Sequence, residues 1–127
     1  MISPRYCPAC FRVISPEDHL CPFCRTNIRV WSRTTPYTLR LIHALNHPHS
    51  EVRMGAIISL GKRKEIEAAL PLAECALRWP TDVVQELEIV QSIALFPSSR
   101  EREEALNRLL SHPAHAIRTA ADRAREK

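Results

Sequence analysis

Four cysteines near the N-terminus have the type and spacing of metal ligands. They form two Cys-x-x-Cys pairs, Cys7 with Cys10 and Cys21 with Cys24, and ten residues separate the pairs. Each pair closes a tight loop that directs both sulfurs inward, and the spacer lets the second loop fold back over the first. Four thiolates arranged in this way can surround one zinc ion tetrahedrally. The sequence therefore predicts one structural zinc ion bound by these four residues.

Two other uses of the same thiols compete with zinc. Disulfides within each pair are the first, but redox pairs of this kind usually stand at the start of a longer helical unit. Iron in a rubredoxin-like site is the second, and that family has a much longer spacing between its pairs. Residues 1–6 contain no apolar signal core, and zinc-type cysteine pairs without such a signal indicate a reducing compartment. We therefore expect zinc and a cytoplasmic location.

The composition is that of a folded protein. The 127 residues are 45% hydrophobic and 25% charged, which leaves room for one ordinary domain or for a small module and a modest second one. No apolar run approaches the roughly 20 residues that a membrane-spanning helix needs. The formal net charge is +4, and four thiolates with one divalent ion add −2, which gives 4 − 2 = +2. This is a weak bias towards anionic partners rather than the charge of a dedicated nucleic-acid binder.

Residues 1–31 are predicted to form the metal module, and the polar residues 32–36 to form a linker that ends at Pro36. Residues 11–14 and residues 26–31 have strand-like patterns, so we expect two short β-strands. So small a segment cannot bury a sufficient core, and metal binding must supply its folding free energy. The pattern resembles a zinc ribbon. Zinc-ribbon loops often carry glycine directly after the second cysteine, where Phe11 and Arg25 stand in this chain.

From Tyr37 onwards the hydrophobic period becomes helical, and a unit recurs. Leu45-Asn46-His47-Pro48 is echoed 65 residues later by Leu110-Ser111-His112-Pro113, and Pro80 lies half-way between them. A period of 32 to 33 residues predicts stacked helical pairs, here three, over residues 37–64, 65–97 and 98–127. Within this pattern we expect Ser50 and Asp82 to cap helices and Pro71 to kink one.

The segment from Val52 to Gly61 carries a resemblance to HEAT repeats of the phycobilisome-lyase type. It matches the opening Val-Arg-x-x-Ala-x-x-x-Leu-Gly of the second helix of such a repeat at every fixed position. The resemblance implies an all-helical solenoid over residues 37–127, in which Arg53 bonds a turn of a neighbouring repeat and Asp82 is a candidate partner. Enzymes of this class, the deoxyhypusine hydroxylases, hold iron through a His-Glu pair directly after Val-Arg. This chain has Met54-Gly55, Glu86-Leu87 and Thr119-Ala120 there, so that activity is not implied and we expect no enzyme.

An apolar face on the second helices of the first two repeats predicts the function. A sizeable apolar surface on a soluble helical repeat usually marks a partner site. We therefore expect a non-enzymatic adaptor that binds a protein partner, or a second copy of itself, through this face. The competing interpretation is that the zinc module folds back over the face. The predicted contact residues are Met54, Ile58, Glu86, Val90 and Ile93.

A cluster of arginines and aromatic residues around the second cysteine pair supports an alternative function. Arg25, Arg29, Arg33 and Trp31 combine phosphate-binding and base-stacking chemistry, which predicts a nucleic-acid-binding accessory protein.

Of the remaining candidate residues, Cys75 is predicted to pack as a small apolar residue between helices. His47, His49, His112 and His115 fall in or beside predicted turns and are expected to be turn residues rather than metal ligands.

Overall fold

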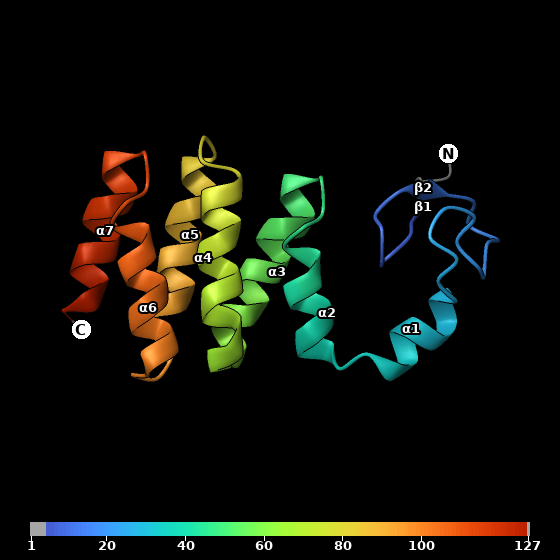
Figure 1. Cartoon of the computed structure of the whole chain (residues 1–127), viewed down its shortest axis with the longest axis horizontal. Coiled ribbons are helices and arrows are strands. Elements are labelled where there is room, and N and C mark those ends of the chain that lie inside the picture. The colour runs from blue at the N-terminus through green and yellow to red at the C-terminus, as the bar shows by residue number, and fades with distance from the viewer. Residues whose placement is uncertain (1–4, 127) are drawn as a thin grey trace.

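The computed structural model describes residues 5–126, which form a small two-stranded sheet followed by seven α-helices (Figure 1). Strand β1 (Arg5–Tyr6) pairs antiparallel with β2 (Val13–Ile14), so that Arg5 lies opposite Ile14 and Tyr6 opposite Val13. The predicted strand over residues 11–14 is therefore present as β2, within its last two residues.

The second predicted strand, over residues 26–31, is wrong. An isolated bridge pairs Leu20 with Asn27, and the chain then enters helix α1 (Ile28–Thr34). Asn27 explains the change, because its side-chain oxygen accepts the backbone N–H of Val30 at 3.1 Å and so caps the helix. Helix α1 also takes up residues 32–34 of the predicted linker, which leaves Thr35 and Pro36 between α1 and the next helix.

The remaining helices follow one another as pairs, stacked from α2 to α7 (Figure 1). Within each pair the two helices pack together, and α5 also packs against α3 and α7 in the neighbouring pairs. Helix α4 packs against α6 in a second layer. The pairs are α2 (Tyr37–Ala44) with α3 (Ser50–Arg63), α4 (Ala69–Arg78) with α5 (Val83–Ala94), and α6 (Arg100–Leu109) with α7 (His115–Arg125).

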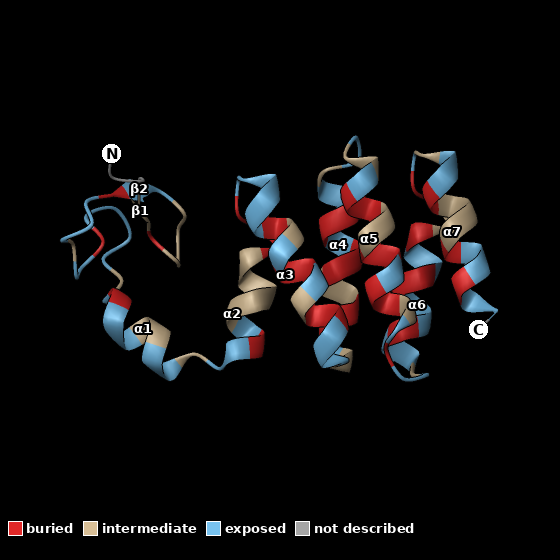
Figure 2. Ribbon diagram, turned by 180° about the vertical axis from the view of Figure 1, so that it is seen from behind, coloured by how far each residue is buried: buried red, intermediate tan, exposed pale blue. Residues whose placement is uncertain are grey.

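One hydrophobic core runs through these pairs, and Figure 2 shows buried residues on each helix from α3 to α7. Leu60, Leu72, Ile89, Leu106 and Ile117 are among its fully buried members. No helix in the described part of the chain combines the length and the apolar character that crossing a bilayer requires.

The two turns related by the 65-residue repeat share one hydrogen-bonding pattern. Nδ1 of His47 accepts the N–H of His49 at 3.0 Å, and Nδ1 of His112 accepts the N–H of Ala114 at 2.9 Å. Each turn is then held by the arginine six residues after its histidine. Nη1 of Arg53 donates to the carbonyls of His47 and Pro48, and Nη1 of Arg118 donates to the two equivalent carbonyls.

The predicted details at the helix ends have mixed outcomes. The cap at Asp82 is confirmed, since its carboxylate accepts the N–H of Gln85 at 3.1 Å. Ser50 is wrong as a cap, because it is the first helical residue of α3 and His49 holds the cap position without a side-chain bond. Pro71 lies in the first turn of α4, after a 3-10 turn over Ile66–Ala68. A missing N–H costs little at that position, so the proline does not interrupt a helix interior.

Candidate functional site

The four predicted ligands, Cys7, Cys10, Cys21 and Cys24, lie together. Their sulfur atoms are all within 4.8 Å of one another, and the pairs Cys7–Cys24 and Cys10–Cys21 are each separated by 3.7 Å. The edge of a tetrahedron with metal–sulfur bonds of about 2.3 Å is about 3.8 Å. A disulfide bond is about 2.05 Å long, so these thiols are free. The arrangement could therefore hold one metal ion.

The backbone around each pair forms the same tight loop. The N–H of Phe11 donates to the carbonyl of Cys7 at 2.8 Å, and the N–H of Arg25 donates to the carbonyl of Cys21 at 2.9 Å. Phe11 and Arg25 take left-handed conformations, with φ of 64° and 65°. These are the positions where glycine is common in zinc ribbons, so the loops keep that geometry at a conformational cost of about 1 kcal/mol or more each.

The surroundings of the thiols differ in how strongly they stabilise the negatively charged thiolate. The hydroxyl of Thr26, 3.2 Å from Sγ of Cys24, is the main cause that lowers the pKa of this thiol to about 6. Desolvation by burial instead raises the pKa of Cys10 to about 12. The backbone N–H groups of Phe23 and Cys24 point at Sγ of Cys21, at 3.4 and 3.5 Å, and would stabilise a thiolate there.

The metal module has little else to hold it together. Its buried core consists of Cys7, Ile14, Cys21 and Ile28, and this cluster is separate from the core of the helical pairs. Two of these four residues are metal-ligand candidates, so we expect the folding of the module to depend on occupation of the site.

Histidines of the first helical pair bind this module. Nε2 of His43 lies 2.7 Å from the carbonyl oxygen of Ala9, and the His43 ring stacks on Phe11 with ring centroids 4.8 Å apart. The hydroxyl of Tyr6 lies 2.8 Å from Nε2 of His49. From the sequence, His49 is predicted to be a turn residue, and no role is predicted for His43. Both contacts join segments at least 34 residues apart, so no local pattern could have revealed them.

The predicted protein-binding residues differ in how far they are buried. Glu86, Val90 and Ile93 lie in the core with at most 4% of their surface exposed, so their prediction as surface contacts is wrong. The reason is the position of α5, which is covered by α3, α4 and α7 together. Met54 is half-buried and Ile58 is 38% exposed, so this part of the predicted face remains on the surface.

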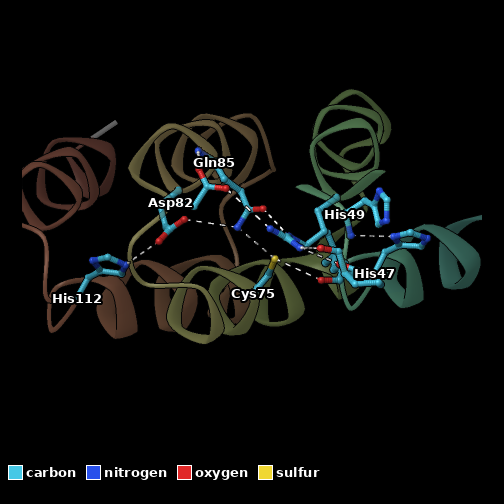
Figure 3. Close-up of polar contacts among 10 residues, drawn as sticks. His47, His49, Cys75, Asp82, Gln85 and His112 are labelled. Atoms are coloured by element: carbon cyan, nitrogen blue, oxygen red, sulfur yellow. Dashed lines mark hydrogen bonds and ion pairs between the residues drawn. The ribbon is translucent and has the colours of Figure 1, made fainter. Parts of the chain in front are cut away.

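Glu86 instead belongs to a buried polar chain that runs through the helical pairs. Figure 3 labels Gln85 and His112, its neighbours in this chain. Its carboxylate lies 3.3 Å from Nε2 of His112. Burial raises the pKa of Glu86 to about 7. The side chain of Gln85 continues the chain, since its Oε1 accepts from Nε of Arg53 at 2.7 Å. The predicted pairing of Arg53 with Asp82 is present as a 3.9 Å contact.

Cys75 lies beside this chain and is completely buried, as predicted. Burial raises the pKa of its thiol to about 11, so the thiol stays protonated at neutral pH. Its Sγ donates to the carbonyl of Leu45 at 3.6 Å and lies 3.9 Å from Nε2 of Gln85.

An apolar groove lies between α3 and α5 on the outer surface. It encloses about 370 Å³ and is lined by Ile58 and Lys62 from α3 and by Glu88, Gln91 and Leu95 along α5. Leu95 is 53% exposed. Sequence reasoning missed Leu95, although it falls on the same helical stripe as Glu88 and Gln91.

The predicted nucleic-acid-binding residues do not line one common hollow. Arg29 and Arg33 line a hollow of about 490 Å³ together with Arg5, and none of the acidic residues in the described part of the chain lines it. Trp31 lines a different cavity. Arg25 lies in the second cysteine loop and does not line either hollow.

Comparison with known proteins identifies no relative: the chain matches no protein-family model, and neither the curated proteins nor the solved structures give a significant match.

Proposed function

We propose that the chain is a non-enzymatic, zinc-binding adaptor of the cytoplasm that recognises a protein partner through a short HEAT-like stack. The groove between α3 and α5 is the observation that supports this function. It combines exposed apolar side chains, Ile58 and Leu95, with one charge of each sign, Lys62 and Glu88. Such a groove fits an amphipathic helix whose apolar side chains enter it while its charges pair at the rim.

The zinc-ribbon-like module has a structural role in this proposal. The described part of the module, residues 5–31, contacts the first helical pair through Tyr6, Phe11 and the histidines that lie against them. The end of a helical repeat stack needs a cover. A metal-held module at this end supplies one.

Matched charge substitutions test the groove. The double variant Ile58→Asp, Leu95→Asp places two carboxylates in it, whereas Leu77→Asp, Leu39→Asp introduces the same charges at residues of matching exposure on α4 and α2. Binding of captured partners and self-association are compared by quantitative mass spectrometry and analytical ultracentrifugation. Partners lost by the groove variant alone support the proposal. A groove variant that keeps every association of the wild-type protein contradicts it.

A second function is favoured by the hollow on α1. Arg29 and Arg33 are exposed and stand one helical turn apart, and Arg5 reaches the same hollow from β1. Three guanidinium groups around one concave surface match the phosphates of a nucleic acid. Anisotropy of labelled single- and double-stranded DNA and RNA at physiological salt tests this function. Binding seen only at low salt would reject it, because such binding is non-specific charge attraction.

A further inference from the structure

Two hollows lie against helix α1 and share one residue, Ser32. The first, the arginine hollow, is lined by Arg5, Arg29 and Arg33 with His19. The second, the junction cavity, encloses about 280 Å³ between the metal module and the first helical pair. Because Trp31 projects roughly opposite to Arg29 and Arg33 on a helix of 3.6 residues per turn, the two hollows open on different sides of α1.

The junction cavity has aromatic walls supplied by both parts of the chain. Tyr6 and Phe11 come from the metal module, Trp31 from α1 and His47 from the turn before α3. Aromatic walls stack on planar rings, and this stacking tolerates different bases because every base has a π-face.

The cavity also offers hydrogen-bond donors. Nε of Arg40, a lining residue, is buried and has no hydrogen-bond partner among the described residues, so it donates to a ligand once the side chain turns towards the cavity. Nδ1 of His47 accepts the N–H of His49, which places the proton of the neutral ring on Nε2 as a second donor. A buried donor without a partner is costly unless a ligand satisfies it. Aromatic walls with two donors fit a planar ring that carries acceptor atoms, as the nucleobases do.

The arginine hollow provides the matching phosphate chemistry. Nη1 of Arg5 donates to the carbonyls of Pro16 and Asp18 at 2.8 and 3.2 Å, which fixes that side chain at the edge of the hollow. Within residues 5–126 no ion pair engages Arg29 or Arg33, so their charges face the hollow uncompensated.

We propose that helix α1 carries a nucleotide site, with the base in the junction cavity, the phosphate on the arginine hollow and the backbone crossing the helix at Ser32. The proposal rests on the second function above and adds base recognition to it. The ligand is an unpaired residue of a single strand or a free nucleotide, which have the same chemistry. The site requires the folded metal module, because that module supplies Tyr6, Phe11 and Arg5.

A pair of oligonucleotides separates the two halves of this site. The probes are fluorescein-labelled single-stranded dT12 and an abasic strand of equal length, which keeps the phosphates and lacks the bases. Affinities for the zinc-loaded full chain are measured by anisotropy at physiological salt. We expect dT12 to bind at least about tenfold more tightly than the abasic strand, as one or more stacked bases would provide.

Substitutions then locate each half. Ala44→Met fills the junction cavity from α2, and Val52→Trp fills it from the exposed side of α3, so one variant remains if the other misfolds. Either should abolish the preference for dT12 while leaving abasic binding unchanged. Arg29→Gln, Arg33→Gln should weaken both strands about equally. The control Arg100→Gln, Arg123→Gln removes the same charge from exposed sites on α6 and α7 and should change neither.

Each other outcome has a definite meaning. Equal affinity for dT12 and the abasic strand overturns base recognition but leaves nucleic-acid binding standing. If neither strand binds, nucleic-acid binding is overturned, and binding of 5′-AMP or dTMP is then measured by calorimetry. Binding that is lost in Ala44→Met identifies a free nucleotide as the ligand. Absence of such binding overturns base recognition as well. A preference for dT12 that survives both cavity-filling variants also overturns the proposal.

Discussion

The imidazole of His112 lies 3.3 Å from the carboxylate of Glu86, with both side chains completely buried between the helical pairs. Nδ1 of His112 accepts the N–H of Ala114, so its single ring proton sits on Nε2, between Glu86 and the carbonyl oxygen of Ala76. Burial lowers the pKa of His112 and raises that of Glu86 to about 7. Both shifts favour the uncharged form of the pair.

Glu86→Gln should change how stability depends on pH. The folded-state pKa of about 7 exceeds the ordinary value of 4.5, so the folded protein holds this proton more tightly than the unfolded chain. The free energy of unfolding should consequently fall as pH rises from about 4.5 through 7. Glutamine still accepts the His112 proton and cannot ionise. We expect the variant to be about 1–2 kcal/mol more stable than the wild type at pH 8 and nearly equal at pH 5. Urea denaturation at both values measures this, and parallel pH curves would contradict it.

Removal of the metal should unfold the N-terminal module and leave the helical pairs folded. The two hydrophobic clusters are separate, and three of the candidate metal ligands, Cys7, Cys10 and Cys21, belong to the smaller one. A chelator that competes for zinc should abolish the protected amides of residues 5–31 in hydrogen exchange, while the helical circular dichroism falls only by the share of α1. Loss of the whole helical signal would instead show that the module is an integral part of the larger core.

His43→Ala should detach the module without unfolding either part. The substitution removes the hydrogen bond to Ala9 and the stacking on Phe11. Trypsin should then cleave after Arg33, beside the short connection to α2, several-fold faster than in the wild type. His115→Ala on the exposed start of α7 is the matched control and should leave this rate unchanged. An equal rate in His43→Ala would mean that these contacts do not hold the module.

Arg53→Met should cost more stability than Arg118→Met. Both arginines bond two turn carbonyls, but Arg53 also bonds Gln85 and lies 4.0 Å above the ring of Trp79. We expect a loss of about 2–4 kcal/mol for Arg53 and about 1 kcal/mol for Arg118. Thermal unfolding monitored by circular dichroism compares them, and equal losses would argue against a role for the additional contacts.

The two glycines of the chain should respond oppositely to alanine. A Cβ at Gly55 would meet nothing within 4 Å, so Gly55→Ala should stabilise α3 by about 0.5–1 kcal/mol through helix propensity. A Cβ at Gly61 would lie 2.6 Å from Oγ of Ser92 and 3.1 Å from its Cα, so Gly61→Ala should destabilise the α3–α5 contact by about 1–3 kcal/mol. Denaturant midpoints test both, and stabilisation by Gly61→Ala would show that α3 and α5 can separate freely.

The cysteine cluster and the order of the helical pairs could be predicted from the sequence because both depend on local spacing. Two Cys-x-x-Cys pairs bring their sulfurs together through short loops, and a helical period persists over many residues. The strand predicted over residues 26–31 failed because one capping side chain, Asn27, outweighed the alternating pattern.

The interaction surface was harder to predict because burial is a property of the assembled stack. Ile93 and Ile58 look alike in the sequence, yet α7 and α4 cover only the helix that carries Ile93. The contacts of His43 and His49 with the metal module join distant segments and leave no periodic trace.

Native mass spectrometry of the purified full chain, with the metal identified by elemental analysis, tests the metal site on which both proposed functions rest. We expect one zinc ion per chain and no disulfide in the metal-loaded protein. We expect each of the variants Cys7→Ser and Cys21→Ser to lose the zinc ion. A metal-free chain whose mass is lowered by the hydrogens of two disulfides, or a chain that carries iron, would contradict these expectations.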